Sequence, residues 1–178
     1  SRKNTVEAKK VVDIYKQLKK DYPDNTFGII AFSISQENAI REAFEVNKID
    51  VNELIGSKEE ELFIKNLETV QGDERDIIII SVAYGKDSGG KFSYNFGPLN
   101  KDNGYKRLNV AITRSRFKTV IISSLDPSEL DEDKISAGGV RFLKNYLEYA
   151  KNKDFGQFTQ TTEGIGFDSG FEEAVYQV

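Results

Sequence analysis

Three arginines fall within ten residues in the stretch RLNVAITRSR, at positions 107, 114 and 116. The arginine guanidinium is permanently charged and planar, and its fork of N–H donors matches the oxygens of a phosphate. If residues 107–116 form a helix, Arg107 and Arg114 lie two turns apart on the same flank. The opposite side of this helix would face the core with Leu108, Ala111, Ile112 and Ser115. The alternative is that both arginines are ordinary solvated charges paired with surface carboxylates.

A second polar stretch, TVQGDERD at 69–76, leads into an isoleucine-rich run. Gly72 allows a tight backbone turn, and Gln71 lies beside it among acidic side chains. Glu74 could accept hydrogen bonds from a ribose hydroxyl, while Thr69 and nearby backbone amides could bind a nucleic-acid phosphate. The alternative is a polar turn whose charges pair locally.

The glycine-rich stretch GKDSGGK at 85–91 matches a phosphate-binding P-loop as far as Lys91. Phe92 follows, where a P-loop has the Ser or Thr that binds Mg²⁺, and the next residues show no helical period. We therefore interpret the match as a coincidence. Asp126 ends another apolar run in the manner of a magnesium-binding carboxylate, but without a P-loop it is better explained as a helix N-cap. We expect no metal site in this chain.

Composition excludes several chemistries. The chain has 178 residues and contains neither histidine nor cysteine, which argues against serine-protease, papain-like and zinc-hydrolase sites and against disulfides. The net charge is −4, yet residues 101–118 contain six basic residues and one acidic residue. Positive charge is thus concentrated around the arginine stretch, as a local nucleic-acid contact would require.

The elements that must position these residues read as alternating strands and helices. Apolar runs that barely alternate predict strands buried on both faces, at 27–32, 76–83 and 119–125, with a weaker strand at 62–70. Three- and four-residue spacings of apolar residues predict helices in three segments, around 8–18, 39–44 and 140–150. The order predicts a mainly parallel, doubly wound sheet in a three-layer α/β/α domain. Residues 85–104 read as a long loop.

The composition changes after about residue 152. Residues 153–170 are polar and contain several glycines, which predicts a linker, and FEEAVYQV at 171–178 then reads as the start of a new helix. We expect a domain at 1–152, followed at 153–178 by a linker and the first helix of a truncated further domain. The chain thus looks like a piece of something larger.

Taken in order, TVQGDERDIIIISVAYG and GPLNKDNGYKRLNVAITRSR closely resemble motifs V and VI of superfamily 1 helicases. The resemblance is to the branch that includes the nonsense-mediated-decay RNA helicase and related bacterial DNA helicases, which we associate with the AAA_12 domain. FGIIAFSISQ at 27–36 is similar to the motif IV region. The final FDSGFEEAVYQV resembles the first helix of a very-short-patch-repair-type endonuclease domain.

The resemblance implies a RecA-like domain with a P-loop NTPase-like fold, the second of two in an ATP-dependent motor. It implies that Arg114 is the arginine finger and that Arg107 is a second phosphate or interdomain contact. Gln71, Gly72 and Glu74 would face the nucleotide, whereas Ser33, Gln36 and Thr69 would contact a DNA or RNA single strand. The partner would be an N-terminal RecA-like domain of the same polypeptide, and ATP and Mg²⁺ would bind only together with that domain.

The chain contains no first-domain motifs, so we expect the 178 residues alone to be inactive as an ATPase and helicase. Two alternatives remain: a non-catalytic α/β module that binds nucleic acid or protein through residues 101–118, and a self-sufficient P-loop NTPase, which Phe92 disfavours. No apolar run approaches the ~20 residues of a membrane span, and no signal peptide is evident, so we expect a cytoplasmic protein.

Overall fold

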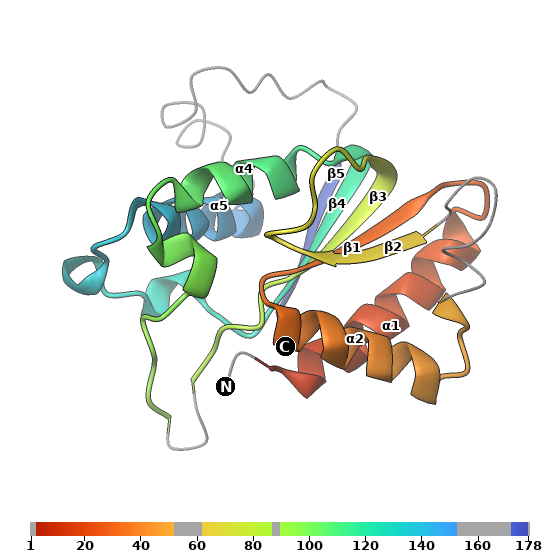
Figure 1. Ribbon diagram of the computed structural model, residues 1–178, viewed down its shortest axis with the longest axis horizontal. Helices are drawn as coiled ribbons and strands as arrows, with labels where there is room; N and C mark the ends of the chain where they lie inside the picture. Colours follow the sequence, from red (N-terminus) through yellow and green to blue (C-terminus); the bar gives the residue numbers. More distant parts are fainter. Residues whose placement is uncertain (1–2, 52–61, 87–89, 153–171, 178) are drawn as a thin grey trace.

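The computed structural model describes residues 3–51, 62–86, 90–152 and 172–177. Five parallel strands form one sheet in the order β2-β1-β3-β4-β5. The strands are β1 (Phe27–Ala31), β2 (Leu62–Asn66), β3 (Arg75–Ser81), β4 (Ser115–Ser123) and β5 (Glu172–Gln177). Helices α1 (Thr5–Asp21) and α2 (Ile34–Val46) cover one face, and α4 (Gly104–Ile112) and α5 (Gly138–Asn152) cover the other (Figure 1). The expected three-layer α/β/α fold with a parallel sheet is confirmed.

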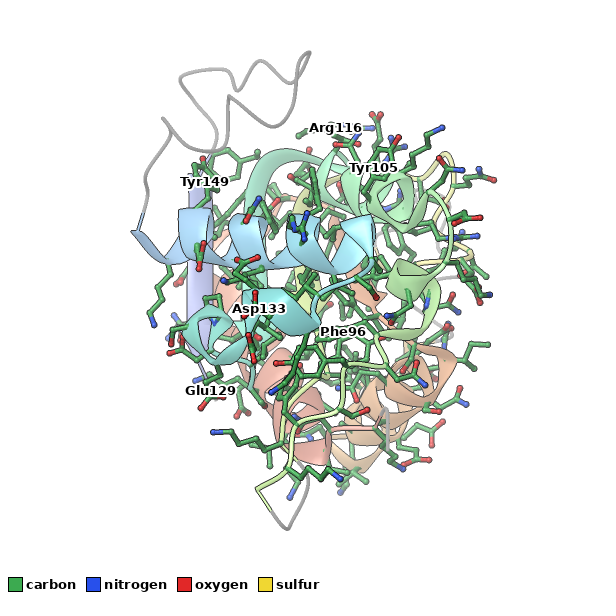
Figure 2. All side chains as sticks on the ribbon, turned by 90° about the vertical axis from the view of Figure 1, so that its left-hand side faces the viewer. Phe96, Tyr105, Arg116, Glu129, Asp133 and Tyr149 are labelled. Atoms are coloured by element: carbon green, nitrogen blue, oxygen red, sulfur yellow. The ribbon has the colours of Figure 1, made fainter. Side chains whose placement is uncertain are left out.

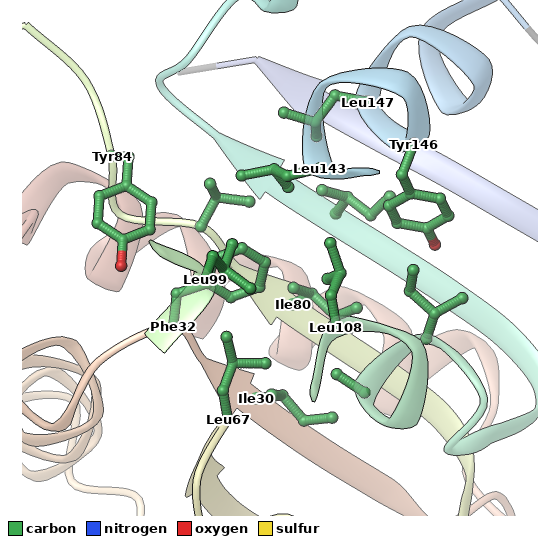
Figure 3. Packing of buried hydrophobic residues seen from close by; sticks show 14 of the residues in the cluster. Ile30, Phe32, Leu67, Ile80, Tyr84, Leu99, Leu108, Leu143, Tyr146 and Leu147 are labelled. Atoms are coloured by element: carbon green, nitrogen blue, oxygen red, sulfur yellow. The ribbon is translucent and has the colours of Figure 1, made fainter. Parts of the chain in front are cut away.

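The central strands are apolar throughout because both of their faces are buried. Along β3, Ile77 and Ile79 belong to the core under α1 and α2, while Ile78 and Ile80 belong to the core under α4 and α5. Figure 3 shows the second core, where side chains of α4 and α5 pack against those of the strands. The labelled residues there include Ile30, Ile80, Leu99, Leu108, Leu143, Tyr146 and Leu147.

Short one-turn helices lie in the segments that lead to α4 and α5. They are η1 (Gly97–Asn100), η2 (Pro127–Glu129) and η3 (Glu132–Lys134). The carbonyl oxygen of Leu99 in η1 approaches the first residues of both α4 and α5: a Cβ built on Gly104 would lie 2.5 Å from it, and one on Gly139 would lie 2.4 Å from it. Glycine at both positions is therefore required by this close approach. Among the described residues, none of the helices is both long and apolar enough to span a membrane.

The helix expected over 107–116 is wrong at its C-terminal end. Helix α4 ends at Ile112, and β4 begins at Ser115, four residues before the strand that we expected at 119. Thr113 caps the helix, and its Oγ1 donates to the carbonyl oxygen of Val110 at 3.1 Å. The helical spacing is overridden because Ser115 pairs with Arg75 at the start of the parallel ladder. Arg107 and Arg114 therefore do not share one helix flank.

The helix expected at the end of the chain is also wrong. Residues Glu172–Gln177 form β5, which pairs in parallel with β4, with Ala174 opposite Val120. Its apolar run is too short for periodicity to separate strand from helix, and Val175 and Tyr176 favour a strand. The expected linker at 153–170 lies outside the described residues. The proposed domain boundary near residue 152 falls at the end of a described range, so it stays a prediction.

The connection between β2 and β3 carries much of the expected site. The strand expected over 62–70 ends at Asn66, and residues 67–74 run without a helix from the carboxyl end of β2 to the amino end of β3 (Figure 1). Leu67 and Val70 are buried in the core under α4 and α5, so the connection crosses that face of β1. Parallel strands usually need a longer crossover with a helix. Here the helix is replaced by this short polar connection.

Candidate functional site at two edges of the sheet

The two arginine-containing motifs meet at the end of the sheet where β3 and β4 begin, which we call its amino-terminal edge. The backbone N–H of Arg75 donates to the carbonyl oxygen of Arg114 at 3.1 Å. The turn at 71–74 and the turn from α4 to β4 are thereby joined by a backbone hydrogen bond. Residues that are about 40 positions apart in sequence thus lie side by side.

The guanidinium of Arg114 folds back over the end of α4. Its Nε donates to the carbonyl oxygen of Val110 at 2.9 Å, and Nη2 contacts Thr113 Oγ1 at 3.4 Å. A cation suits this place because the last carbonyls of a helix carry partial negative charge. Among the described residues Nη1 donates no hydrogen bond, and the residue is half-buried. Part of the fork thus stays available to an anion.

The other residues expected at the nucleotide lie around this edge, with different partners. Gln71 and Gly72 are exposed at the turn, and Gly72 has a φ of +80°, which strains any other residue. Arg107 lies inside α4, where its Nη1 donates to the carbonyl oxygen of Pro98 at 3.4 Å. This contact directs Arg107 toward η1, whereas Arg114 lies at the strand edge. The structure therefore brings Arg114 and the turn together but shows no contact between the two arginines.

Arg116, to which the sequence assigned no role, pairs with the turn. Its Nε lies 3.7 Å from Glu74 Oε2, and its Nη1 lies 3.9 Å from Asp76 Oδ1. The register between β3 and β4 shifts between Arg75 and Ile77, so β4 has one extra residue opposite β3. Such a bulge re-aims side chains. Figure 2 shows Arg116 at the upper end of the molecule, far from Glu129.

Ser33 and Thr69 lie at the opposite, carboxyl-terminal edge. Ser33 caps α2, and its Oγ accepts a hydrogen bond from the backbone N–H of Gln36 at 3.1 Å. The Thr69 side chain is exposed, and its Oγ1 accepts from the backbone N–H of Asn66 at 3.2 Å. Asn66 in turn donates to Glu37 in the first turn of α2 at 2.7 Å. The ends of β1 and β2 thus carry two of the three residues expected at a nucleic-acid backbone, the exposed Thr69 and Ser33, whose exposed fraction is 9%.

Gln36 does not fit its expected role in this geometry. Its side chain has no exposed surface, and its amide is fully engaged. Oε1 accepts from the backbone N–H of Asn4 at 2.7 Å, and Nε2 donates to Asn4 O and to Ser81 Oγ, both at 3.0 Å. The amide therefore joins α2 to the start of α1 and to the end of β3, and its burial argues against a contact with nucleic acid.

Comparison with known proteins agrees with the motifs. A family model described as an AAA domain, AAA_12, matches residues 1–126, well over half of the chain. The chain belongs to the AAA_12 family. The match and the relatives described next support a superfamily 1 helicase-like domain.

Three curated relatives of this AAA_12 domain are uncharacterised ATP-dependent helicases. The protein of Mycoplasma genitalium is 33% identical over 162 residues, covering 84% of this chain and 14% of that protein. The homologue from Mycoplasma pneumoniae is 33% identical over 160 residues, with the same coverage. The protein of Methanocaldococcus jannaschii is 32% identical over 151 residues, covering 84% of this chain and 19% of its own length. The chain thus spans less than a fifth of these relatives.

The amino-terminal edge of this AAA_12 domain presents a cation that suits an anionic ligand. The partly unpaired fork of Arg114, next to the turn at 71–74, fits the oxygens of a phosphate. Within the described ranges there is no group of three or more potential metal ligands. After Lys91 the next helical residues are those of η1, beginning at Gly97, so no helix N-terminus directly follows the glycine-rich stretch.

Asp126 is an N-cap, as interpreted from the sequence. Its Oδ1 accepts from the backbone N–H of Ser128 at 2.9 Å at the start of η2, and its Oδ2 accepts from Lys151 Nζ, also at 2.9 Å. The hydrogen bonds from Lys151 and Ser128 lower the pKa of Asp126 to about 2. Its carboxylate is therefore already committed to the contact between η2 and α5.

Sequence reasoning missed a buried carboxylate at the carboxyl-terminal edge. Glu7 has no exposed surface, and its oxygens accept from the backbone N–H groups of Ala83 and Ser124, each at 2.8 Å, and from Ser81 Oγ at 2.8 Å. Burial raises the pKa of Glu7 above its usual range. One signal was present: Glu7 precedes Val11 by one helical turn, which places it on the apolar face of α1.

Proposed function

We propose that this chain is the second RecA-like motor domain of a superfamily 1 helicase that hydrolyses ATP and moves along a DNA or RNA single strand in the cytoplasm. The hydrogen bond from Arg75 N to Arg114 O carries the proposal, because it places the two motifs at one edge of the sheet. The names of the relatives support ATP-dependent helicase activity in the family.

In this proposal the amino-terminal edge faces an ATP site shared with a preceding RecA-like domain of the same polypeptide. ATP bound there with Mg²⁺ supplies the phosphoryl group that is transferred to water, and the preceding domain holds both. Arg114 stabilises the charge that develops on the phosphate oxygens, and Glu74, with Gln71 and Gly72, lies toward the ribose and phosphates. Glu74 must exchange its pairing with Arg116 for this contact. Arg107 is placed to support the turn before α4 rather than the phosphate.

The carboxyl-terminal edge contacts the single strand through Ser33 and Thr69. Closure of the two domains around ATP would then move these backbone contacts relative to those of the first domain, which gives stepwise translocation. The strands are parallel, so the carboxyl ends of β1 and β2 and the amino ends of β3 and β4 lie at opposite ends of the sheet. The residues proposed to contact the single strand are thus a sheet length away from those proposed to contact ATP, which supports two separate ligands.

The test uses the full-length polypeptide and measures ATP hydrolysis with and without single-stranded nucleic acid. Arg114→Ala should lower strand-stimulated kcat by about 10³-fold, the magnitude seen for arginine fingers. Arg141→Ala is the matched control, because Arg141 is an exposed arginine of α5 far from the motifs in sequence. Full activity of the Arg114→Ala variant would rule out the finger. Salt-dependent binding of nucleic acid without any response to ATP would favour a non-catalytic binding module.

The isolated 178 residues provide a second test. We expect no appreciable ATP hydrolysis, since the chain has no complete P-loop. Robust turnover by this chain that is abolished by Lys91→Ala would show instead that it is a self-sufficient NTPase.

A further inference from the structure

Arg75 is an arginine with an exposed fraction of only 8%, at the first residue of β3. Burying a guanidinium is costly unless the charge is compensated. Here the guanidinium lies over the ring of Phe63 in β2, with 5.1 Å between its carbon and the ring centroid, and Nη1 donates to the carbonyl oxygen of Glu74 at 2.8 Å. Arg75 thus fastens the last residue of the turn to a neighbouring part of the sheet.

Phe63 forms the platform for this contact. A Cβ built on Gly28 would lie 2.4 Å from Phe63 Cζ, so the ring covers Gly28 in the adjacent strand β1. Lys65, also in β2, has its Nζ 5.8 Å from the same ring centroid and pairs with Asp73. One aromatic ring therefore interacts with two cations, each of which is bonded to one residue of the turn.

The backbone of Arg75 extends this attachment to Arg114. Its N–H donates to Arg114 O at 3.1 Å, and its Cα pairs in register with Ser115 just before the bulge. The extra residue of β4 interrupts the ladder beyond this pair. The position of Arg114 at the end of the sheet thus depends on the first residue of β3, whose side chain is held by Phe63.

We infer that Arg75 is a positioning residue for ATP hydrolysis: stacked on Phe63, it holds Glu74 and Arg114 in the arrangement in which they meet the nucleotide. The inference rests on the proposed function, because it assumes that Arg114 is the finger. Arg75 itself has no contact with the phosphates in this role. A displacement of about 1 Å in a catalytic group can cost on the order of 10²-fold in rate, so the loss of this support is measurable.

The experiment compares Arg75→Met, Arg75→Lys and Arg114→Ala in the full-length polypeptide by strand-stimulated ATP hydrolysis. Methionine keeps an apolar side chain on Phe63 but removes the charge and the donor to Glu74. We expect kcat to fall about tenfold or more, with KM for ATP changed by less than about threefold, as for loss of an arrangement used in the transition state. Lysine should restore part of kcat, because a cation over the ring is retained.

Phe63→Leu keeps the inference testable if Arg75→Met folds poorly, as seen by thermal unfolding. This variant leaves Arg75 in place but removes its aromatic support, and we expect the same selective loss of kcat. Combining Phe63→Leu with Arg75→Met should add little further loss, since the two residues act together. If Arg75→Met or Phe63→Leu keeps full kcat while Arg114→Ala is inactive, the inference about Arg75 is wrong but the proposed function stands. Full activity of Arg114→Ala would overturn the proposed function, and the inference with it.

Discussion

At the scale of single residues, two buried polar side chains, Glu7 and Gln36, connect the elements that form the carboxyl-terminal edge of the sheet. Glu7 and Gln36 together connect the starts of α1 and α2 to the ends of β3 and β4. The local sequence pattern does not reveal the partners of Glu7 and Gln36, because these partners lie more than 30 residues away in sequence. These two residues thus define the carboxyl-terminal edge without facing solvent.

Substitution of Glu7 by Gln tests this attachment. The amide NH₂ of glutamine would face a backbone N–H where Glu7 accepts, which leaves a buried donor unpaired and should cost about 1–3 kcal/mol of unfolding free energy. Urea unfolding measures the change. Glu42→Gln is the control, because Glu42 is an exposed partner of Lys3 and its loss should cost under about 0.5 kcal/mol. An equal effect of both variants would contradict the structural role.

We also expect the difference in unfolding free energy between wild type and Glu7→Gln to depend on pH. The pKa of Glu7 is raised in the folded state, so the folded protein binds this proton more readily than the unfolded chain. The stabilising contribution is complete below the unfolded pKa, near 4.5, and is lost as pH rises through the folded pKa. Since Gln does not titrate, the stability difference between wild type and Glu7→Gln should shrink as pH rises above about 4.5. A difference that grows with pH would show that the pKa is lowered instead.

The residue types at the amino-terminal edge could be predicted from the sequence, whereas their partners could not. The turn at 71–74 and Arg114 form adjacent motifs in space, as the resemblance implies. The pairing of Arg116 with Glu74 depends on a bulge in β4, and the burial of Arg75 depends on a ring in β2. Both follow from which strands lie near one another and from a local bulge, and these are contacts between segments far apart in sequence that the local pattern does not show.

At the scale of elements, the strands and helices were predicted well but their ends were not. The three central strands, β1, β3 and β4, were found because runs of β-branched residues buried on both faces are distinctive. The end of α4 was missed because helical spacing continues through Ser115, and only pairing with β3 shows that the chain has changed direction. Helix ends thus depend on tertiary contacts that override local propensity.

Two consecutive glycines at the start of α5 give a matched test of how α4, α5 and η1 converge. Gly139→Ala would place a Cβ 2.4 Å from the Leu99 carbonyl oxygen, so the backbone must shift and we expect a loss of about 1–3 kcal/mol. Gly138→Ala meets no atom within 4 Å and should be neutral or stabilise by up to about 1 kcal/mol. Thermal unfolding of both variants decides, and equal midpoints would contradict the close approach.

At the scale of the whole molecule, the sheet has one edge strand whose presence the sequence did not predict. Strand β5 pairs along Lys118 to Ser123 of β4, which includes the apolar residues of that strand. This pairing makes residues Glu172–Gln177 part of the same sheet as the other four described strands. Within FDSGFEEAVYQV, which resembles the first helix of a repair endonuclease domain, the described residues Glu172–Gln177 form a strand and not a helix.

Removal of β5 tests its contribution. A chain that ends at Asn152 would leave the backbone donors and acceptors of β4 unpaired along an apolar strand, which promotes association between copies. We expect a lower midpoint of thermal unfolding and a shift toward oligomers in size-exclusion chromatography with light scattering. An unchanged midpoint together with a monomeric profile would show that β5 does not protect this edge.

The place of β5 in the chain also has a consequence for synthesis on the ribosome. All four other strands and both helix layers precede residue 153, so they can assemble before the residues of β5 have been made. During that interval the outer side of β4, with Val120, Ile121 and Ile122, is an open template for any passing strand. The time between the emergence of β4 and that of β5 is therefore the period in which a nascent chain is most exposed to wrong pairing.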